Sequence, residues 1–177
     1  MMVKLELLKQ SDASALLEFE LKNKEWFESF IEARDDDFFD DNGIKDHVNF
    51  CLAEYKKGLL YPTLIKDEND QILGRANLYN IDRVKNSGSI GYRIGEEFTS
   101  QGLATLATKE LLEIGKNRYE LSSVNAVAST DNAASQKVLM KNGFKQVGFK
   151  PEFAFVDGEI IDCYEYRCLI QQLSPVT

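Results

Sequence analysis

The stretch Phe98–Leu112, FTSQGLATLATKELL, sets a lone glycine, Gly102, at the start of a segment with helical periodicity. The apolar positions recur at a spacing typical of a helix, at Leu103, Ala107, Leu111 and Ile114. A helix start has unpaired amides and a partial positive charge, and both attract phosphate groups. Ala104 keeps the first turn thin, and Thr105 adds a hydroxyl donor. The stretch therefore predicts a turn, Thr99–Thr105, that holds a pyrophosphate.

Two common phosphate-binding motifs do not fit this turn. The P-loop needs a Lys-Ser/Thr pair after its glycines, and the dinucleotide fingerprint needs three glycines after the first strand of a βαβ unit. Neither pattern occurs here. A glycine before a helix can also serve the conformation of the turn alone. The rest of the chain must therefore decide between a binding turn and a structural one.

Composition favours an ordinary soluble globular protein and one domain over residues 1–177. The chain is 44% hydrophobic and 28% charged, and its net charge of −8 disfavours nucleic acid as a partner. Cys51, Cys163 and Cys168 lack paired spacing, which indicates a reducing compartment. No secretory leader or membrane-length apolar run is apparent, so we expect a cytoplasmic protein without a membrane partner.

The periodicity along the chain predicts the element order β-α-α-β-β-β-α-β-α-β-β. A strand at residues 3–7 precedes a helix capped by Ser11 or Asp12, and a second helix runs from Ile44 to Gly58 after a turn at Asn42-Gly43. Two strands around Asp157-Gly158 close the chain as a hairpin. This mixture predicts an α/β sheet with helices on its faces.

A second motif lies in DNAASQKVLMKNGF, residues 131–144. Asn132, Ser135 and Val138 recur at every third position of a short helix that ends in Gly143-Phe144. Together with the earlier turn, this segment resembles the GNAT acetyltransferase superfamily. The family's Gln/Arg-x-x-Gly-x-Gly/Ala motif stands here as Thr99-Ser100-Gln101-Gly102-Leu103-Ala104, with Thr in the Gln/Arg position. Its Asn-x-x-Ala/Ser motif stands as Asn132 to Ser135.

The resemblance implies a mixed α/β fold, the GNAT fold, whose mostly antiparallel sheet is splayed between the fourth and fifth strands. It also implies acetyl-CoA as co-substrate and no metal. The amides of the Thr99–Thr105 turn would hold the pyrophosphate. The strand end around Ile94 would pair with the pantetheine arm, and Asn132 would hydrogen-bond that arm.

The segments GRANLYNID and SIGYRIG, residues 74–82 and 89–95, further resemble the branch with ribosomal-protein N-terminal acetyltransferases. The implied activity is an acyltransferase reaction, the transfer of acetyl from acetyl-CoA to a primary amine. A protein or peptide N-terminus is the leading acceptor. A small amine such as a polyamine or an amino sugar is the alternative.

The catalytic groups are less completely specified by these motifs. Many GNAT enzymes have a Tyr acid seven residues after the motif Asn, and here that position is Leu139. The ribosomal-protein branch uses the Ser that corresponds to Ser135, although this side chain could instead support the helix start. A common Glu base would fall at Ser89. Glu152 is the candidate base here, and a water chain without a dedicated base is equally open.

Several readings stay open at this point. The missing Tyr and Glu at Leu139 and Ser89 motivate a non-catalytic acyl-CoA-binding module as an alternative. Five aspartates in the segment 35–41 form either a solvated loop or a surface that attracts a cationic acceptor. His47, the only histidine, lies off the apolar stripe of its helix and is expected at the surface. Tyr79, Asn77 and Arg93 could line the acceptor site, and a homodimer is also open.

Overall fold

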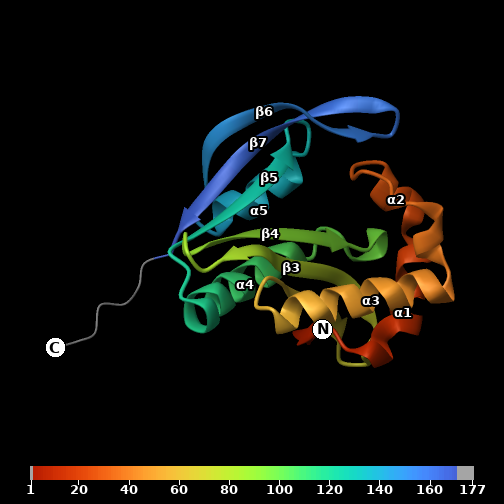
Figure 1. Ribbon diagram of the computed structural model, residues 1–177. Helices are drawn as coiled ribbons and strands as arrows, with labels where there is room; N and C mark the ends of the chain where they lie inside the picture. Colours follow the sequence, from red (N-terminus) through yellow and green to blue (C-terminus); the bar gives the residue numbers. More distant parts are fainter. Residues whose placement is uncertain (1, 171–177) are drawn as a thin grey trace.

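A mixed sheet of seven strands organises the protein in the computed structural model, which describes residues 2–170 (Figure 1). The strand order is β1-β2-β3-β4-β5-β7-β6, and every neighbouring pair is antiparallel except β4 and β5. The strands are β1 (Val3–Leu7), β2 (Tyr61–Asp67), β3 (Ile72–Asp82), β4 (Ser87–Ile94), β5 (Ser123–Ser129), β6 (Lys145–Val156) and β7 (Glu159–Leu169). The expected mostly antiparallel sheet is confirmed.

The parallel pair at the centre of the sheet is short. Only Ser87–Ser89 of β4 pairs with Ser123–Asn125 of β5. Beyond these residues β4 continues to Ile94 and β5 to Ser129 without pairing to each other, and Figure 1 shows the two strands diverging. The expected splay is therefore confirmed. It leaves a wedge whose two walls are unpaired strand edges.

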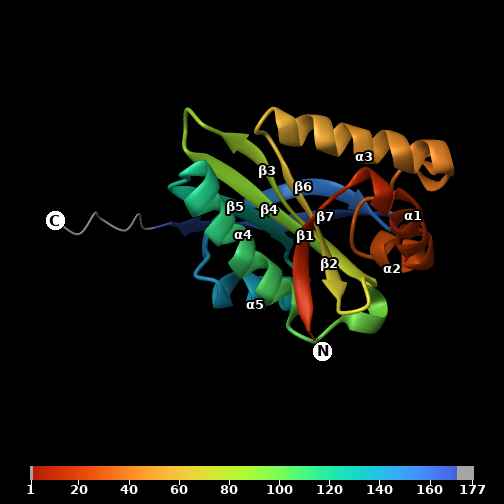
Figure 2. The same cartoon turned by 90° about the horizontal axis from the view of Figure 1, so that it is seen from below.

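Helices cover both faces of the sheet, as expected (Figure 2). The helices α1 (Ala13–Lys22), α2 (Lys24–Glu28) and α3 (Asp41–Lys56) lie on one face, and α4 (Leu103–Tyr119) and α5 (Ala133–Lys141) lie on the other. Successive side chains of a strand point to opposite faces of the sheet, so each face has its own hydrophobic core. Leu64 and Ile72 belong to the core under α1–α3, whereas their neighbours Ile65 and Leu73 belong to the core under α4 and α5.

Two details of the predicted order differ from the structure. The short α2 was not predicted, because five residues are too few to show a helical period. The expected turn at Asn42-Gly43 is wrong, since both residues belong to the first turn of α3. Asp40 caps that turn by accepting a hydrogen bond from the Gly43 amide at 2.7 Å. Gly43 is required there because a Cβ would collide with the carbonyl oxygen of Asp37.

Three 3-10 turns complete the path of the chain. They are η1 (Gln10–Asp12), η2 (Asp36–Phe39) and η3 (Glu96–Phe98). The predicted hairpin is present between β6 and β7, with positive φ at both Asp157 and Gly158. No helix within residues 2–170 has the length and apolar character needed to cross a membrane.

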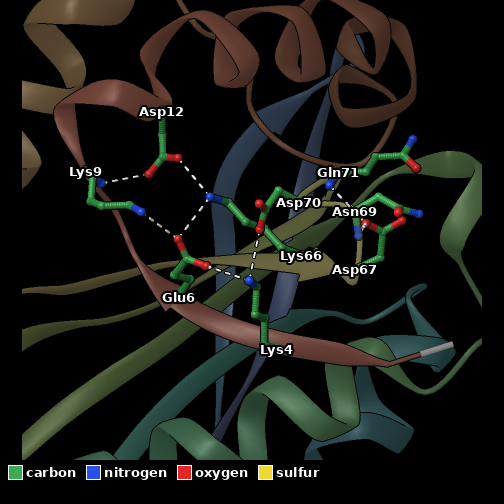
Figure 3. Close-up of polar contacts among 9 residues, drawn as sticks. All are labelled: Lys4, Glu6, Lys9, Asp12, Lys66, Asp67, Asn69, Asp70 and Gln71. Atoms are coloured by element: carbon green, nitrogen blue, oxygen red, sulfur yellow. Dashed lines mark hydrogen bonds and ion pairs between the residues drawn. The ribbon is translucent and has the colours of Figure 1, made fainter.

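An ion network fastens the start of α1 to β2 (Figure 3). The ammonium of Lys66 is buried and lies 2.9 Å from Asp12 Oδ1 and 3.2 Å from Glu6 Oε1. Asp12 Oδ2 accepts the amide of Lys9 at 2.8 Å, and the Lys9 ammonium lies 2.9 Å from Glu6. The hydrogen bond from Lys9, followed by those from Lys66 and Lys4, lowers the pKa of Glu6 to about 2. The network therefore needs Glu6 ionised.

Candidate active site

The turn before α4 is open and poor in side chains. Gly102 is its N-cap with φ 76° and ψ 9°, and Ser100 also has a positive φ of 62°. A Cβ built on Gly102 would meet no atom within 4 Å. The amide of Leu106 makes the first helical hydrogen bond, to the Gly102 carbonyl at 3.0 Å. The amides of residues 103–105 precede it and have no carbonyl four residues earlier within the helix.

The side chains of this turn leave the helix start uncovered. Thr99 Oγ1 donates to the Glu96 carbonyl at 3.0 Å, and Gln101 Nε2 donates to the Glu97 carbonyl at 3.4 Å. Both side chains are thus tied to η3 instead of the α4 amides. The open space at Gly102, the unpaired amides and the helix dipole together fit a phosphate-bearing group.

Ile94 ends β4 at the wide part of the wedge. It pairs with Gly74 of β3, and its carbonyl also accepts the Trp26 indole N–H from α2 at 3.1 Å. On the side toward β5, β4 has no strand partner after Ser89. An extended chain could add to this free edge by main-chain hydrogen bonds, as another strand would.

Ser135 and Tyr92 meet between α5 and β4, on the α5 side of the sheet. Asn132 caps α5, its Oδ1 accepting the Ser135 amide at 3.1 Å. The Ser135 hydroxyl lies 2.7 Å from the Tyr92 hydroxyl, which reaches it from the unpaired part of β4. Burial raises the pKa of Tyr92, so the phenol stays protonated and can donate. The structure therefore brings Asn132, Ser135 and Tyr92 together.

Tyr92 lies in the segment SIGYRIG, but no functional role was predicted for it. Its alternation with Ile90 and Ile94 predicts a residue on an apolar face, which is correct for the ring. The hydroxyl contact depends on where α5 packs, and that is a tertiary feature. Leu139, at the position of the family's Tyr acid, is 1% exposed in the core. Ser89 lies at the last paired position of β4 with β5.

Glu152 lies apart from this group, on β6. Its side chain is exposed and its φ is +50°, within a register irregularity between Lys150 and Ala154. Its amide donates to Asp162 Oδ1 at 2.8 Å. Within residues 2–170 its carboxylate forms no ion pair at 4.0 Å or less. The role of Glu152 stays a prediction.

The opposite face of β4 carries a buried charge cluster. The Glu20 carboxylate from α1 is 1% exposed and lies 2.8 Å from Arg75 Nη1 and 3.2 Å from Arg93 Nη1. Arg75 Nη2 is 2.7 Å from His47 Nε2. A guanidinium only donates, so His47 Nε2 accepts and Nδ1 carries the ring proton. The predicted lining residue Arg93 thus lies in a cluster below α1 and α2.

His47 is half-buried, which corrects the expected surface position. Its ring packs 5.0 Å from the ring of Phe38, which covers this side of α3. Burial is the largest cause that lowers the pKa of His47 to about 3, and Arg75 and Arg34 lower it further. The helix pattern shows only that His47 lies beside the apolar stripe. It does not show that η2 covers that side.

The acidic segment lies outside this cluster. Its five aspartates are exposed: Asp35, Asp36, Asp37, Asp40 and Asp41. Phe38 and Phe39 are half-buried, and Phe38 packs against the core under α1–α3. Asn77 accepts the Thr63 amide, and Tyr79 is half-buried against the same core. Across the described residues, no group of three or more His, Cys, Asp or Glu side chains is placed to hold a metal ion.

Comparison with known proteins agrees with this architecture. Residues 3–145 match the family model described as an acetyltransferase (GNAT) domain. YdaF of Bacillus subtilis, provisionally named a ribosomal N-acetyltransferase, is 27% identical over 179 residues, which cover 94% of this chain and 91% of YdaF. The crystal structure of ribosomal-protein-S5-alanine acetyltransferase from Vibrio fischeri has a TM-score of 0.93 at 22% identity, covering 99% of this chain and 97% of its own.

A further solved structure of a similar protein contains coenzyme A. RimL, a ribosomal L7/L12 α-N-protein acetyltransferase in complex with coenzyme A, has a TM-score of 0.87 at 22% identity and covers 96% of this chain and 95% of its own. The open turn at Gly102 and the β4–β5 wedge provide the features that such a ligand needs. The chain belongs to the GNAT family and is an acetyl-CoA-dependent N-acetyltransferase.

Proposed function

We propose that this enzyme transfers acetyl to the α-amino group of a protein or peptide N-terminus. The observation that best supports this reaction is the Ser135–Tyr92 pair at the β4–β5 wedge. The two hydroxyl oxygens lie 2.7 Å apart, and the Asn132 cap holds Ser135 at the start of α5. The acceptor class is supported by the two solved structures, whose names specify the ribosomal proteins S5 and L7/L12, and by YdaF, which is provisionally named a ribosomal N-acetyltransferase. Residues 1–177 form one catalytic domain in this proposal.

The co-substrate would be held by groups from three elements. The amides of the Thr99–Thr105 turn take the pyrophosphate, the free edge of β4 near Ile94 pairs with the pantetheine arm, and Asn132 donates to that arm through its side-chain amide. Acetyl-CoA supplies the thioester carbonyl and a thiolate leaving group. The positions of Thr99 and Gln101 support this assignment, since both side chains leave the α4 amides uncovered.

Two proton transfers are required of the enzyme. An α-amino group has a pKa of about 8, so a large fraction of the acceptor is protonated at neutral pH and must lose that proton before it attacks. Glu152 is the proposed base, with a water chain as the alternative. Ser135 is the proposed acid for the leaving thiolate. Tyr92 can donate to Ser135 Oγ, which leaves the serine's single hydrogen free to donate elsewhere.

The test is an acetyl-transfer assay with three acceptor panels: short peptides with free N-termini, polyamines and amino sugars. Release of CoA together with a one-acetyl mass increase at the peptide N-terminus is the expected result. Transfer only to polyamines or amino sugars would refute the acceptor class. Binding of acetyl-CoA by calorimetry without CoA release from any panel would favour the non-catalytic module. Three free, buried cysteines support a reducing, cytoplasmic location for the enzyme, so the assay is run under reducing conditions.

A further inference from the structure

The charge cluster below α1 and α2 holds more guanidinium groups than carboxylates. Arg34, Arg75 and Arg93 act on the single buried carboxylate of Glu20, and His47 is neutral because its pKa is about 3. Glu20 forms ion pairs with Arg75 and Arg93 but none with Arg34. One carboxylate thus faces three guanidinium groups, and Arg34 is the one without an ion-pair partner among the described residues. Burying a charge without a counter-charge is costly, so this arrangement favours an added negative charge.

Two donors of this cluster are unused. Nε of Arg34 and Nε of Arg75 are buried, and neither has a hydrogen-bond partner among residues 2–170. The Arg75 side chain is 4% exposed. The Arg34 guanidinium stacks 4.3 Å from the Phe38 ring centre, and that of Arg93 stacks 5.0 Å from the Phe27 ring centre. Contact with the ring face leaves the N–H edge of Arg34 for an acceptor, whereas Arg93 already donates to Glu20 at 3.2 Å.

A small cavity adjoins Arg34 and Arg93, whereas Arg75 is not among its lining residues. Its volume is about 10 Å³, enough for one water or one carboxylate oxygen. It is lined by Glu20, Lys24, Phe27, Glu28, Glu32, Arg34, Phe39 and Arg93. Glu28 is paired with Lys24 at 3.3 Å, and Glu32 is exposed, so neither neutralises Arg34. The cavity therefore presents an unpaired guanidinium to whatever enters it.

The cavity lies on the α1–α3 face of the sheet, beside the end of β4. Tyr92 and Arg93 are successive residues of β4, so their side chains point to opposite faces. Tyr92 reaches Ser135 on α5, whereas Arg93 reaches Glu20 on α1. The phosphate-binding turn belongs to the α4 and α5 face. On the other face, Trp26 of α2 contacts the end of β4 through the Ile94 carbonyl. A group in this cavity thus lies beside the wedge but away from the proposed CoA phosphates.

We propose that this cavity binds a carboxylate of the acceptor. The proposal rests on the proposed acetylation of peptide N-termini and names the acceptor more closely: a peptide with an acidic side chain close to its free amine. A carboxylate supplies the missing negative charge, and one of its oxygens can enter the cavity and accept a charge-assisted hydrogen bond from Arg34. The same chemistry could come from the α-carboxylate of a free amino acid.

The experiment compares matched acceptors. Two peptides that begin Ser-Glu and Ser-Gln and are otherwise identical are assayed with the parent enzyme and with Arg34→Gln. The parent should prefer Ser-Glu in kcat/KM by about tenfold, the effect of one hydrogen bond to a charged group. In Arg34→Gln the ratio should fall to about one. Arg83→Gln, which removes an exposed arginine in the β3–β4 connection, should retain the parent ratio.

The outcomes separate this inference from the proposed function. Equal rates with both peptides in the parent, together with equal rates for L-serine and L-serinamide, overturn the carboxylate site, while the N-terminal activity stands. No acetylation of either peptide overturns the proposed function itself. If Arg34→Gln is destabilised in thermal unfolding, the peptide pair with the parent still decides. A preference for L-serine over L-serinamide that is lost in Arg34→Gln would retain the site and assign the carboxylate to a free amino acid.

Discussion

Gly102 combines a left-handed backbone with open space where a side chain would begin. Replacing it with Val would strain the turn and fill the space that the phosphates would occupy. We expect Gly102→Val to weaken acetyl-CoA binding at least tenfold, by about 1.4 kcal/mol or more. Isothermal calorimetry with the folded variant measures this.

A matched control separates strain from ligand exclusion. Gly58 has the same kind of backbone, φ 75°, and a Cβ there also meets no atom within 4 Å. It lies at the end of α3, away from the proposed turn. Gly58→Val should cost similar stability and leave the affinity unchanged. Equal losses of affinity in the two variants would mean that strain alone explains the effect.

Ser135 offers a test of the proposed acid. Removing an acid that acts in the transition state should lower kcat on the order of 10²-fold with little change in the KM for acetyl-CoA. Steady-state kinetics of Ser135→Ala measure both constants. A change confined to KM would make Ser135 a binding residue or a support for the start of α5.

Tyr92→Phe tests how Ser135 is held. The change keeps the ring in the core and removes only the hydroxyl that lies 2.7 Å from Ser135 Oγ. We expect kcat to fall about tenfold, since one hydrogen bond is lost. In the double variant with Ser135→Ala the two effects should not add, because they share one contact. Additive losses of kcat would show that Tyr92 acts independently of Ser135.

At the scale of single elements, the ion network on β1 predicts a pH-dependent stability. The folded-state pKa of Glu6 is lowered from 4.5 to about 2, so its contribution is present above about 4.5 and is lost as the pH falls toward 2. Glu6→Gln should therefore reduce the free energy of unfolding by about 1 kcal/mol at pH 7. The expected value is small because the ion pairs of Glu6 are partly exposed to solvent.

Urea unfolding at pH 7, 4 and 3 provides the check. The difference in the free energy of unfolding between the parent and Glu6→Gln should shrink steadily from pH 7 to pH 3. Glu18→Gln is the control, since Glu18 is an exposed carboxylate of α1 without an ion pair among the described residues. A difference that is constant from pH 7 to pH 3 would show that the charge of Glu6 is not what stabilises this end of α1.

The elements themselves were largely predictable, because their signals are local. The glycine turn at Gly102 and the hairpin at Asp157-Gly158 each need only a few consecutive residues. The Tyr92 contact and the buried position of His47 were not predictable. Each depends on which element packs over it, α5 in one case and η2 in the other. Of the proposed catalytic pair, only Ser135 on α5 was therefore predicted, and Tyr92 on β4 was not.

At the scale of the whole molecule, the net charge of −8 includes the five exposed aspartates of residues 35–41. These charges would raise the local concentration of a cationic acceptor. Changing Asp35, Asp36 and Asp37 to Asn should raise the KM for a lysine-containing peptide, and added salt should reduce the difference, since exposed charges are screened within ~10 Å at 0.1 M. The KM for acetyl-CoA should not change.

A charge-matched variant controls for the overall field of the protein. Glu110, Glu113 and Glu120 lie on or directly after α4, on the opposite face of the sheet from α1–α3. Their change to Gln removes the same three charges and should leave the acceptor KM as in the parent. If the acceptor KM changes neither with the aspartate substitutions nor with salt, this segment is a solvated surface that does not attract the acceptor.

The short β4–β5 pairing has a mechanical consequence. Three residue pairs at one end are all the strand pairing that joins the β1–β4 half of the sheet to the β5–β7 half. Within each half the neighbouring strands are antiparallel and pair over at least five residues, so the seam between the halves has the shortest strand pairing of the described sheet. A ligand that bridged both walls would brace that seam and slow amide hydrogen exchange along it. The co-substrate would then complete the tertiary structure as well as supply the acetyl group.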